Sequence, residues 1–145
     1  MNLESLLFRA EDYEPARKYL LRRYVSDINI KRLYAHDNLD QDIPKKLFNN
    51  QTETDDKGII WLNEGVESKH GQRVPLGTDP RVVIPIKNQD GELIGIQTRS
   101  IDPLLGKGMR YQGIKYKDEP QIFNIENIDE SKTIFVVEGE ICAMH

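Results

Sequence analysis

Hydrophobic positions recur at two spacings along the chain, and the spacing predicts where helices and strands form. From Pro15 to Val25, apolar and aromatic residues recur every three or four positions, which is the spacing of one helix face. Pro15 lies in the first turn, where its missing N–H costs nothing. A second, shorter helix is expected from Ser26 or Asp27, either of which can cap it, through about Leu33. The N-terminal part is therefore expected to be helical.

The clearest strand signal is a β-hairpin. Arg81–Ile86 is rich in β-branched residues, Asn88–Gly91 has the composition of a turn, and Leu93–Arg99 has the pattern of the return strand. Pro85 cannot donate a ladder hydrogen bond, so we expect its strand to lie at a sheet edge or to tolerate a bulge. Ile59–Leu62 is a further short strand candidate.

The remaining segments divide into connections and a C-terminal unit. Asp37–Lys57 is polar and acid-rich, and Ser68–Pro80 is rich in glycine and proline, so both are expected to connect other elements. Thr133–Val137 is a continuous apolar run, the pattern of a strand that is buried on both faces. It leads through Glu138-Gly139-Glu140 into the helix-like Ile141–His145.

Composition narrows the class of protein. A length of 145 residues allows one domain, or one domain and a piece of another. A charged fraction of 30%, without an apolar run near the roughly 20 residues of a membrane span, predicts a soluble, cytoplasmic protein. The single cysteine, Cys142, excludes a disulfide framework and an all-cysteine zinc site. His36, His70 and His145 are scattered and are expected to be ordinary surface residues, so we expect no zinc site.

Charge is segregated along the chain, although the net charge is only −4. Pro15–Tyr34 holds six basic residues and one acid, Lys107–Lys117 holds four basic residues and no acid, and Asp118–Glu140 is strongly acidic. Tyrosines lie among the basic residues, and cations with flat rings are what single-stranded nucleic acid requires. For Arg17–Arg23 a solvated helix face is the favoured interpretation. For Arg110–Lys117, which we expect to be a glycine-containing loop, binding and simple solvation stay equally open.

The carboxylate of Glu138 lies where ligand-binding residues are often found in α/β folds. Glu138 follows the apolar Thr133–Val137 run and precedes Gly139. Open α/β sheets bind ligands at the carboxyl ends of their strands, and a glycine there permits a sharp turn and a close approach. The alternative is that Glu138 is a helix N-cap or a first-turn acid stabilised by the helix dipole.

Several segments, in this order, resemble the catalytic core of replicative DNA primases of the bacterial and phage type, which contain a Toprim fold: Pro15–Arg23, Arg81–Ile86, Asp90–Arg99, Arg110–Lys115, Gln121–Ile125 and Val136–Glu140. In that family a hydrophobic hairpin precedes a basic segment with tyrosine and then a Val-Val-Glu-Gly strand end. The helix Pro15–Arg23 and the stretch after Arg110 are most similar to the tailed-phage branch. The resemblance runs from about Glu14 to Ala143.

The resemblance implies an α+β fold in which a helical part precedes an antiparallel hairpin or mixed sheet, and the sheet leads into the first Toprim strand. Residues 1–131 would form the N-terminal subdomain of the core, with a helical part over 1–57 and strands and loops over 58–131. Residues 132–145 would begin the Toprim subdomain. We therefore expect a piece of a longer primase or a natural remnant of one.

The activity that the resemblance implies is the synthesis of short RNA primers on single-stranded DNA during phage DNA replication. Its substrates would be nucleoside triphosphates, its metal Mg²⁺ or Mn²⁺ in the complete enzyme, and its partner a replicative helicase. Glu138 would be the first catalytic and metal-holding carboxylate of an incomplete site, so the isolated chain is expected to be inactive, without bound metal. The residues implied in template or nucleotide contacts are Arg81, Arg99, Arg110, Tyr111 and Lys115.

Other functions stay open. For Arg81, the role of an edge-strand solubility residue is equally compatible with the sequence. Topoisomerases and certain nucleases also carry a Toprim Glu-Gly, but they have different modules before it. A non-enzymatic module that binds single strands or docks a helicase would need the same basic and aromatic residues without a complete metal site.

Overall fold

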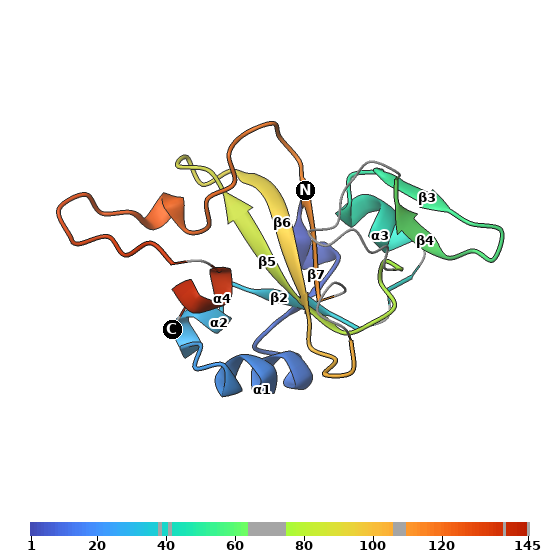
Figure 1. Ribbon diagram of the computed structural model, residues 1–145, viewed down its shortest axis with the longest axis horizontal. Coiled ribbons are helices and arrows are strands. Elements are labelled where there is room, and N and C mark those ends of the chain that lie inside the picture. Colours follow the sequence, from blue (N-terminus) through green and yellow to red (C-terminus); the bar gives the residue numbers. More distant parts are fainter. Residues whose placement is uncertain (38, 41, 64–74, 106–109, 138, 145) are drawn as a thin grey trace.

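The computed structural model describes residues 1–37, 39–40, 42–63, 75–105, 110–137 and 139–144, and its centre is a five-stranded sheet (Figure 1). The strand order is β1 (Phe8–Arg9), β2 (Tyr34–His36), β5 (Arg81–Lys87), β6 (Leu93–Ser100) and β7 (Tyr111–Lys115). A separate hairpin pairs β3 (Thr52–Thr54) with β4 (Ile60–Leu62). All of these pairs are antiparallel, so the α+β class is confirmed, and the described residues contain neither a parallel pair nor a Toprim fold.

The predicted hairpin is confirmed as β5–β6. Its register runs from Arg81 opposite Ser100 to Ile86 opposite Gly95, and then Lys87 lies opposite Leu93. Ile94 is therefore one extra residue in β6, a β-bulge. In the turn, the side-chain oxygen of Asn88 accepts hydrogen bonds from the backbone N–H groups of Asp90 and Glu92. Gly91 supplies the positive φ of +79° that closes the turn.

Strand β5 is not an edge strand, so the first alternative predicted from Pro85 is wrong, whereas the second, a bulge, is found close by between Ile86 and Lys87. Strand β5 lies between β2 and β6. However, β2 pairs only with Arg81, Val82 and Val83, so Pro85 lies beyond the end of that pairing. The missing N–H of proline is tolerated because no described strand continues beside β5 at this point.

Both faces of the sheet are covered. The helices α1 (Glu14–Arg22), α2 (Asp27–Ile30) and α4 (Glu140–Ala143) pack on one face through Ala16, Leu20, Ile30 and Ile141, all buried against Val82 and Ile84. The other face packs against the 3₁₀ helix η1 (Leu3–Ser5), α3 (Asp42–Leu47) and the β3–β4 hairpin. Figure 1 shows α4 returning to lie beside α2, where the Asn29 amide donates a 3.2 Å hydrogen bond to the Met144 carbonyl.

The N-terminal part is less helical than expected. Residues 1–57 include the strands β1, β2 and β3, and the predicted connection Asp37–Lys57 contains both α3 and β3. The predicted loop Arg110–Lys117 is wrong as well, because most of it forms the edge strand β7. Of the predicted loop Ser68–Pro80, residues 75–80 contain neither helix nor strand, and the rest lies outside the described residues.

The predicted buried strand Thr133–Val137 is not formed. The segment has no strand assignment, and the side chains of Phe135 and Val136 are 85% and 93% exposed. A buried strand needs hydrogen-bonding neighbours, and no described strand pairs with this one, so its apolar pattern alone cannot bury it. Figure 1 shows the chain running away from the sheet after the 3₁₀ helix η3 (Ile125–Asn127) and returning at α4, the helix expected at Ile141–His145. No helix among the described residues is long and apolar enough to cross a membrane.

Candidate nucleic-acid interface

Strands β6 and β7, at one edge of the sheet, present a strip of polar, basic and aromatic side chains. Along β7, Tyr111, Gly113 and Lys115 alternate with the buried Gln112 and Ile114, so the first three share one face. The register places Tyr111 opposite Arg99, Gly113 opposite Gln97 and Lys115 opposite Gly95. Arg99, Gln97 and Tyr111 are half-buried and Lys115 is exposed. This β6–β7 strip is therefore open to solvent, on the face that α1 covers over the inner strands.

Arg99 and Tyr111 contact each other on the strip, and Arg99 is also bonded to helix α1. The guanidinium carbon of Arg99 lies 4.3 Å from the centroid of the Tyr111 ring, within the range of a cation–π contact. The Arg99 Nε donates a 3.1 Å hydrogen bond to the Tyr19 hydroxyl of α1. The guanidinium is thus fixed between a helix and a strand, which lowers the conformational entropy that it would lose on binding a ligand.

Charged groups from two helices face the same pair. The pKa of the Tyr111 phenol is raised, mainly by burial, and the Glu140 carboxylate adds to this shift. The positive charges of Arg99 and Arg23 act in the opposite direction. Arg23 follows α1 and Glu140 begins α4, so charges from the ends of both helices act on the Tyr111 phenol. The Tyr111 phenol therefore stays neutral near pH 7, and its ring remains a stacking surface rather than a negative charge.

The other predicted contact residues lie at the two ends of β7. Arg110 is half-buried, and its Nε donates a 3.2 Å hydrogen bond to the Leu105 carbonyl. Lys115 is exposed four residues after Tyr111, a separation of about 13 Å at the usual strand rise. Residues 107–109 of the basic stretch lie outside the described residues. The structure thus brings Arg99 and Tyr111 together. Arg110 directly precedes Tyr111 in the sequence, and Lys115 lies farther along the strip.

Two glycines make room for neighbouring side chains on the strip. A Cβ atom at Gly113 would lie 2.4 Å from the Gln97 side-chain oxygen, and one at Gly95 would lie 2.6 Å from the Ile114 carbonyl oxygen. Over Gly95 lies the Gln121 carboxamide, which donates long hydrogen bonds of 3.4 and 3.3 Å to the carbonyls of Ile94 and Ile114. Glycine is required at these positions because side chains from neighbouring segments occupy the space of a Cβ.

Arg81 has a different role from the one expected. Its side chain is 0% exposed, so it is not an edge-strand solubility residue. The Nε forms a 2.9 Å ion pair with Asp79, and Nη1 donates to the Thr98 hydroxyl at 3.3 Å and to the Arg110 carbonyl at 3.2 Å. These contacts lie on the sheet face opposite the β6–β7 strip. Arg81 therefore positions the backbone before Tyr111 instead of presenting its charge at the surface.

His36 belongs to the same buried cluster and is not a surface residue, contrary to the prediction. It is 2% exposed, and its Nδ1 lies 2.7 Å from the Asp37 carbonyl, which makes this nitrogen the protonated one in the neutral ring. Burial lowers the pKa of His36, and the nearby Arg81 adds to the shift. The described residues contain no group of three His, Cys, Asp or Glu side chains that could hold a metal ion.

The metal expected from the resemblance therefore has no ligand set among the described residues. Glu138, the predicted catalytic carboxylate, lies outside them, as do His70 and His145. Among the described residues, the Glu140 carboxylate acts on the Tyr111 phenol, and a lone carboxylate does not make a divalent-metal site.

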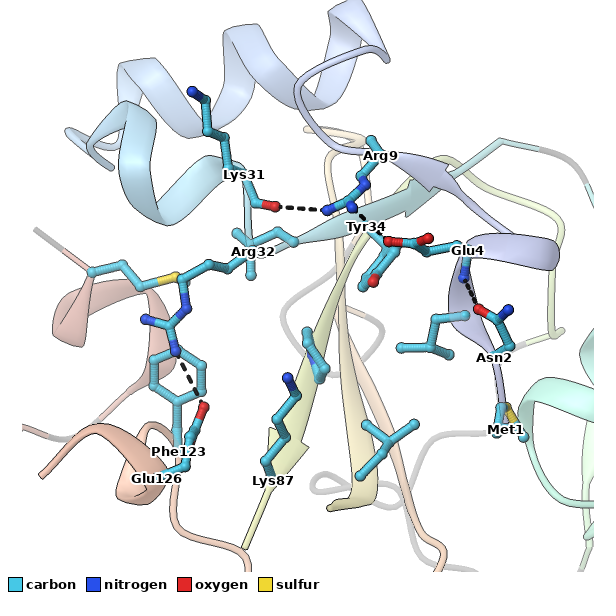
Figure 2. A pocket seen from close by; sticks show the side chains of 15 residues that line it. Met1, Asn2, Glu4, Arg9, Lys31, Arg32, Tyr34, Lys87, Phe123 and Glu126 are labelled. Atoms are coloured by element: carbon cyan, nitrogen blue, oxygen red, sulfur yellow. Dashed lines mark hydrogen bonds and ion pairs between the residues drawn. The ribbon is translucent and has the colours of Figure 1, made fainter. Parts of the chain in front are cut away.

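A pocket of about 510 Å³ lies at the opposite end of the sheet, where β5 extends beyond β2 (Figure 2). Pro85 and Tyr34 line it, and Figure 2 shows the Lys87 side chain pointing toward its centre. Arg9 is held by Glu4 and by the Lys31 carbonyl, at 3.1 Å from the latter. The volume is that of a small-molecule site.

The charges of this pocket are mostly compensated internally. Arg32 forms a 3.2 Å ion pair with Glu126 and a 2.8 Å hydrogen bond to Asn124. The second oxygen of Glu126 is buried and has no hydrogen-bond partner among the described residues. Lys31 and Lys87 are the described side-chain cations of the pocket for which no ion pair is found there. A ligand would therefore need an acidic group for Lys87 and a donor for Glu126.

Comparisons of the chain with known protein families, with curated proteins and with solved structures found no match. The resemblance to primase cores therefore rests on the order and spacing of the motifs. Sequence reasoning missed Tyr19, Arg23 and Glu140 as members of the site. Tyr19 and Arg23 are four residues apart, so they share one helix face, and this spacing was the signal that could have grouped them.

Proposed function

We propose that the chain binds single-stranded nucleic acid along the β6–β7 strip, as the template-binding part of a primase-like core. The observation that carries the proposal is the Arg99–Tyr111 pair, a planar cation held 4.3 Å from an aromatic ring at an open sheet face. Single-strand binding proteins combine such rings, on which bases stack, with cations that contact the phosphates.

The dimensions of the strip fit an extended strand of a few nucleotides. Lys115 lies about 13 Å along β7 from Tyr111, Arg110 directly precedes Tyr111, and the positive charge of Arg23 also acts on the Tyr111 ring. Basic residues therefore precede and follow the aromatic ring along the strand. Its few cations predict weak, salt-dependent binding, because each phosphate contact with a single strand releases only about 0.7 of a counterion.

Fluorescence anisotropy with a labelled single-stranded oligonucleotide, measured at several salt concentrations, tests the proposal. Lys115→Ala should lower the slope of log affinity against log salt by about 0.7. Lys57→Ala makes the same change on the exposed β3–β4 turn and is the matched control, for which no change is expected. Equal slopes for the wild type and both variants would show that the strip is ordinary solvated surface.

A second variant separates stacking from charge. Arg99→Lys keeps the positive charge but replaces a planar group by a compact ammonium, which cannot stack in the same way. We expect weaker binding with an unchanged salt slope. A normal affinity for this variant would contradict the central role of the Arg99–Tyr111 pair.

The primase assignment needs a separate assay, because a non-enzymatic binding module would use the same strip. What supports it is the order of the motifs, together with the confirmed β5–β6 hairpin and the Arg110–Tyr111 segment beside it. Incorporation of labelled ribonucleotides on a single-stranded template, by a protein that contains this chain and its downstream Toprim acids, would support primer synthesis. Tight single-strand binding without incorporation would favour the binding module.

A further inference from the structure

The pocket where β5 extends beyond β2 has a surplus of positive charge that the proposed function does not use. Its described lining contains two acidic and four basic side chains: Glu4, Glu126, Arg9, Lys31, Arg32 and Lys87. Each acid is paired with an arginine, Glu4 with Arg9 and Glu126 with Arg32. The two lysines therefore leave a surplus of two positive charges, which matches the charge of a phosphate monoester, about −1.5 to −2 near pH 7.

Of the two lysines, Lys87 is the one placed to meet an anion inside the pocket. Figure 2 shows its side chain pointing toward the centre, whereas the Lys31 side chain is directed away from Lys87. Lys87 is half-buried and Lys31 is exposed. A charge that is partly shielded from water interacts more strongly with a bound anion, and a lysine ammonium is a common point-charge ligand of phosphate. We therefore expect the anionic group of a ligand at Lys87.

The rest of the lining is mostly apolar and includes the aromatic rings of Tyr34 and Phe123. Sites for small organic molecules have this composition, with hydrophobic and aromatic walls and a few polar groups, and volumes of roughly 300–1,000 Å³. The volume here is about 510 Å³. Inorganic phosphate alone would leave these walls uncovered, so we expect a ligand whose phosphate is attached to a ring.

Glu126 adds a polar group to the wall. Its first carboxylate oxygen pairs with Arg32, and its second oxygen is buried and has no hydrogen-bond partner among the described residues. Buried acceptors are normally satisfied, so a donor on the ligand would complete this one. Arg32 also bonds to Asn124 at 2.8 Å, which holds this wall in place before a ligand arrives.

We propose that the pocket binds a small aromatic phosphate that carries an amino or hydroxyl group on its ring. The phosphate lies at Lys87, the ring lies between the apolar walls, and the ring substituent donates to Glu126. None of the predicted contact residues of the β6–β7 strip belongs to the described lining, so this site is separate from the proposed nucleic-acid interface.

Isothermal titration calorimetry with para-aminophenyl phosphate tests the contact with Lys87. Lys87→Met keeps most of the aliphatic chain and removes the ammonium, so it should weaken binding by about tenfold or more, the effect of losing one charge-assisted hydrogen bond. Lys31→Met removes the same charge from the same pocket and is the matched control, which should bind within about twofold of the wild type. Equal losses for the two variants would overturn the placement of the phosphate at Lys87.

Two simpler ligands test the ring and its substituent. Phenyl phosphate lacks only the amino group and should bind about tenfold more weakly, because the donor to the Glu126 carboxylate is lost. Inorganic phosphate also lacks the ring and should bind more weakly still. Equal affinities for the two phenyl compounds would overturn the contact with Glu126, and an equal affinity for inorganic phosphate would overturn the aromatic ligand.

A competition experiment separates this inference from the proposed function. A single-stranded oligonucleotide should not displace para-aminophenyl phosphate, and Lys87→Met should bind the labelled oligonucleotide as the wild type does. Displacement would mean that the pocket belongs to the nucleic-acid surface, which would overturn a separate site. If the wild type does not bind para-aminophenyl phosphate at millimolar concentration while Lys115→Ala still lowers the salt slope, only this inference fails. The reverse result would overturn the proposed function and leave the pocket as a binding site.

Discussion

Removal of the Asp79 carboxylate should be among the most destabilising single changes in this chain. In Asp79→Ala, the guanidinium of Arg81 would remain at 0% exposure without its ion-pair partner. Breaking a buried pair from one side costs about 3–5 kcal/mol, because the remaining charge is uncompensated. Among the described residues, the Thr98 hydroxyl and the Arg110 carbonyl remain as acceptors for Arg81, so we expect a value near the lower limit, about 3 kcal/mol.

Replacement of both partners should cost much less. The second oxygen of Asp79 is buried and has no hydrogen-bond partner among the described residues, so the pair is incompletely satisfied. In the double variant Asp79→Leu with Arg81→Met, no charge is buried, and we expect stability within about 1 kcal/mol of the wild type or above it. Urea unfolding of the wild type, Asp79→Leu, Arg81→Met and the double variant measures the coupling energy between the two side chains.

Two results would refute this reasoning. A cost below about 1 kcal/mol for Asp79→Ala would mean that water solvates the Arg81 guanidinium after the change. A double variant as unstable as Asp79→Ala would mean that the uncompensated charge of Arg81 is not the cause of the loss.

Three further changes test other parts of the structure. Gly95→Ala should destabilise the fold by about 1–3 kcal/mol, because its Cβ would meet the Ile114 carbonyl. Gly139→Ala is the control, since a Cβ at Gly139 would have no atom within 4 Å. Equal melting temperatures for the two variants would contradict the packing described at Gly95. Burial lowers the pKa of His36 in the folded state, so as the pH falls the unfolded state binds a proton before the folded state does. The free energy of unfolding should therefore be highest above pH 6.5 and should decrease as the pH falls below it. His36→Gln should flatten this pH profile in urea unfolding, and an unchanged profile would argue against it. Tyr116→Phe should cost about 1 kcal/mol in the same assay, because it removes the 2.7 Å hydrogen bond to the Leu47 carbonyl, and an unchanged midpoint would count against that bond.

Local signals predicted the elements whose partners are close in sequence. The β5–β6 hairpin and the helices at Pro15–Val25 and after Ser26 were correct to within a few residues, because turn chemistry and helix spacing are local. The short strands β1 and β2 were not predicted, since each exists only by pairing with a distant strand. The same dependence explains the error at Thr133–Val137, where the apolar pattern was present and the neighbouring strands were not.

The candidate site was predictable in its chemistry and unpredictable in its grouping. The sequence indicated Arg99 and Tyr111, but only the register of β6 and β7 makes them cross-strand neighbours. Arg81 carries the same charge as Arg99 and lies in the next strand, yet strand alternation places it on the opposite, buried face. A shift of one residue in strand register thus decides whether an arginine side chain lies at the surface or in the core, and composition does not reveal the register.

The extra residue Ile94 fixes the register of strand β6 against β5. Leu93 and Ile96 pack in one core and Ile94 in the other, so sliding β6 by one position would pull all three from their places. Arg99, at the far end of the same strand, would then leave the face it shares with Tyr111. The alignment of the β6–β7 strip therefore depends on Ile94, an apolar residue buried in the core. Charged residues of the strip can be exchanged without losing that alignment, whereas deletion of Ile94 would shift Arg99 away from Tyr111 without removing a single charge.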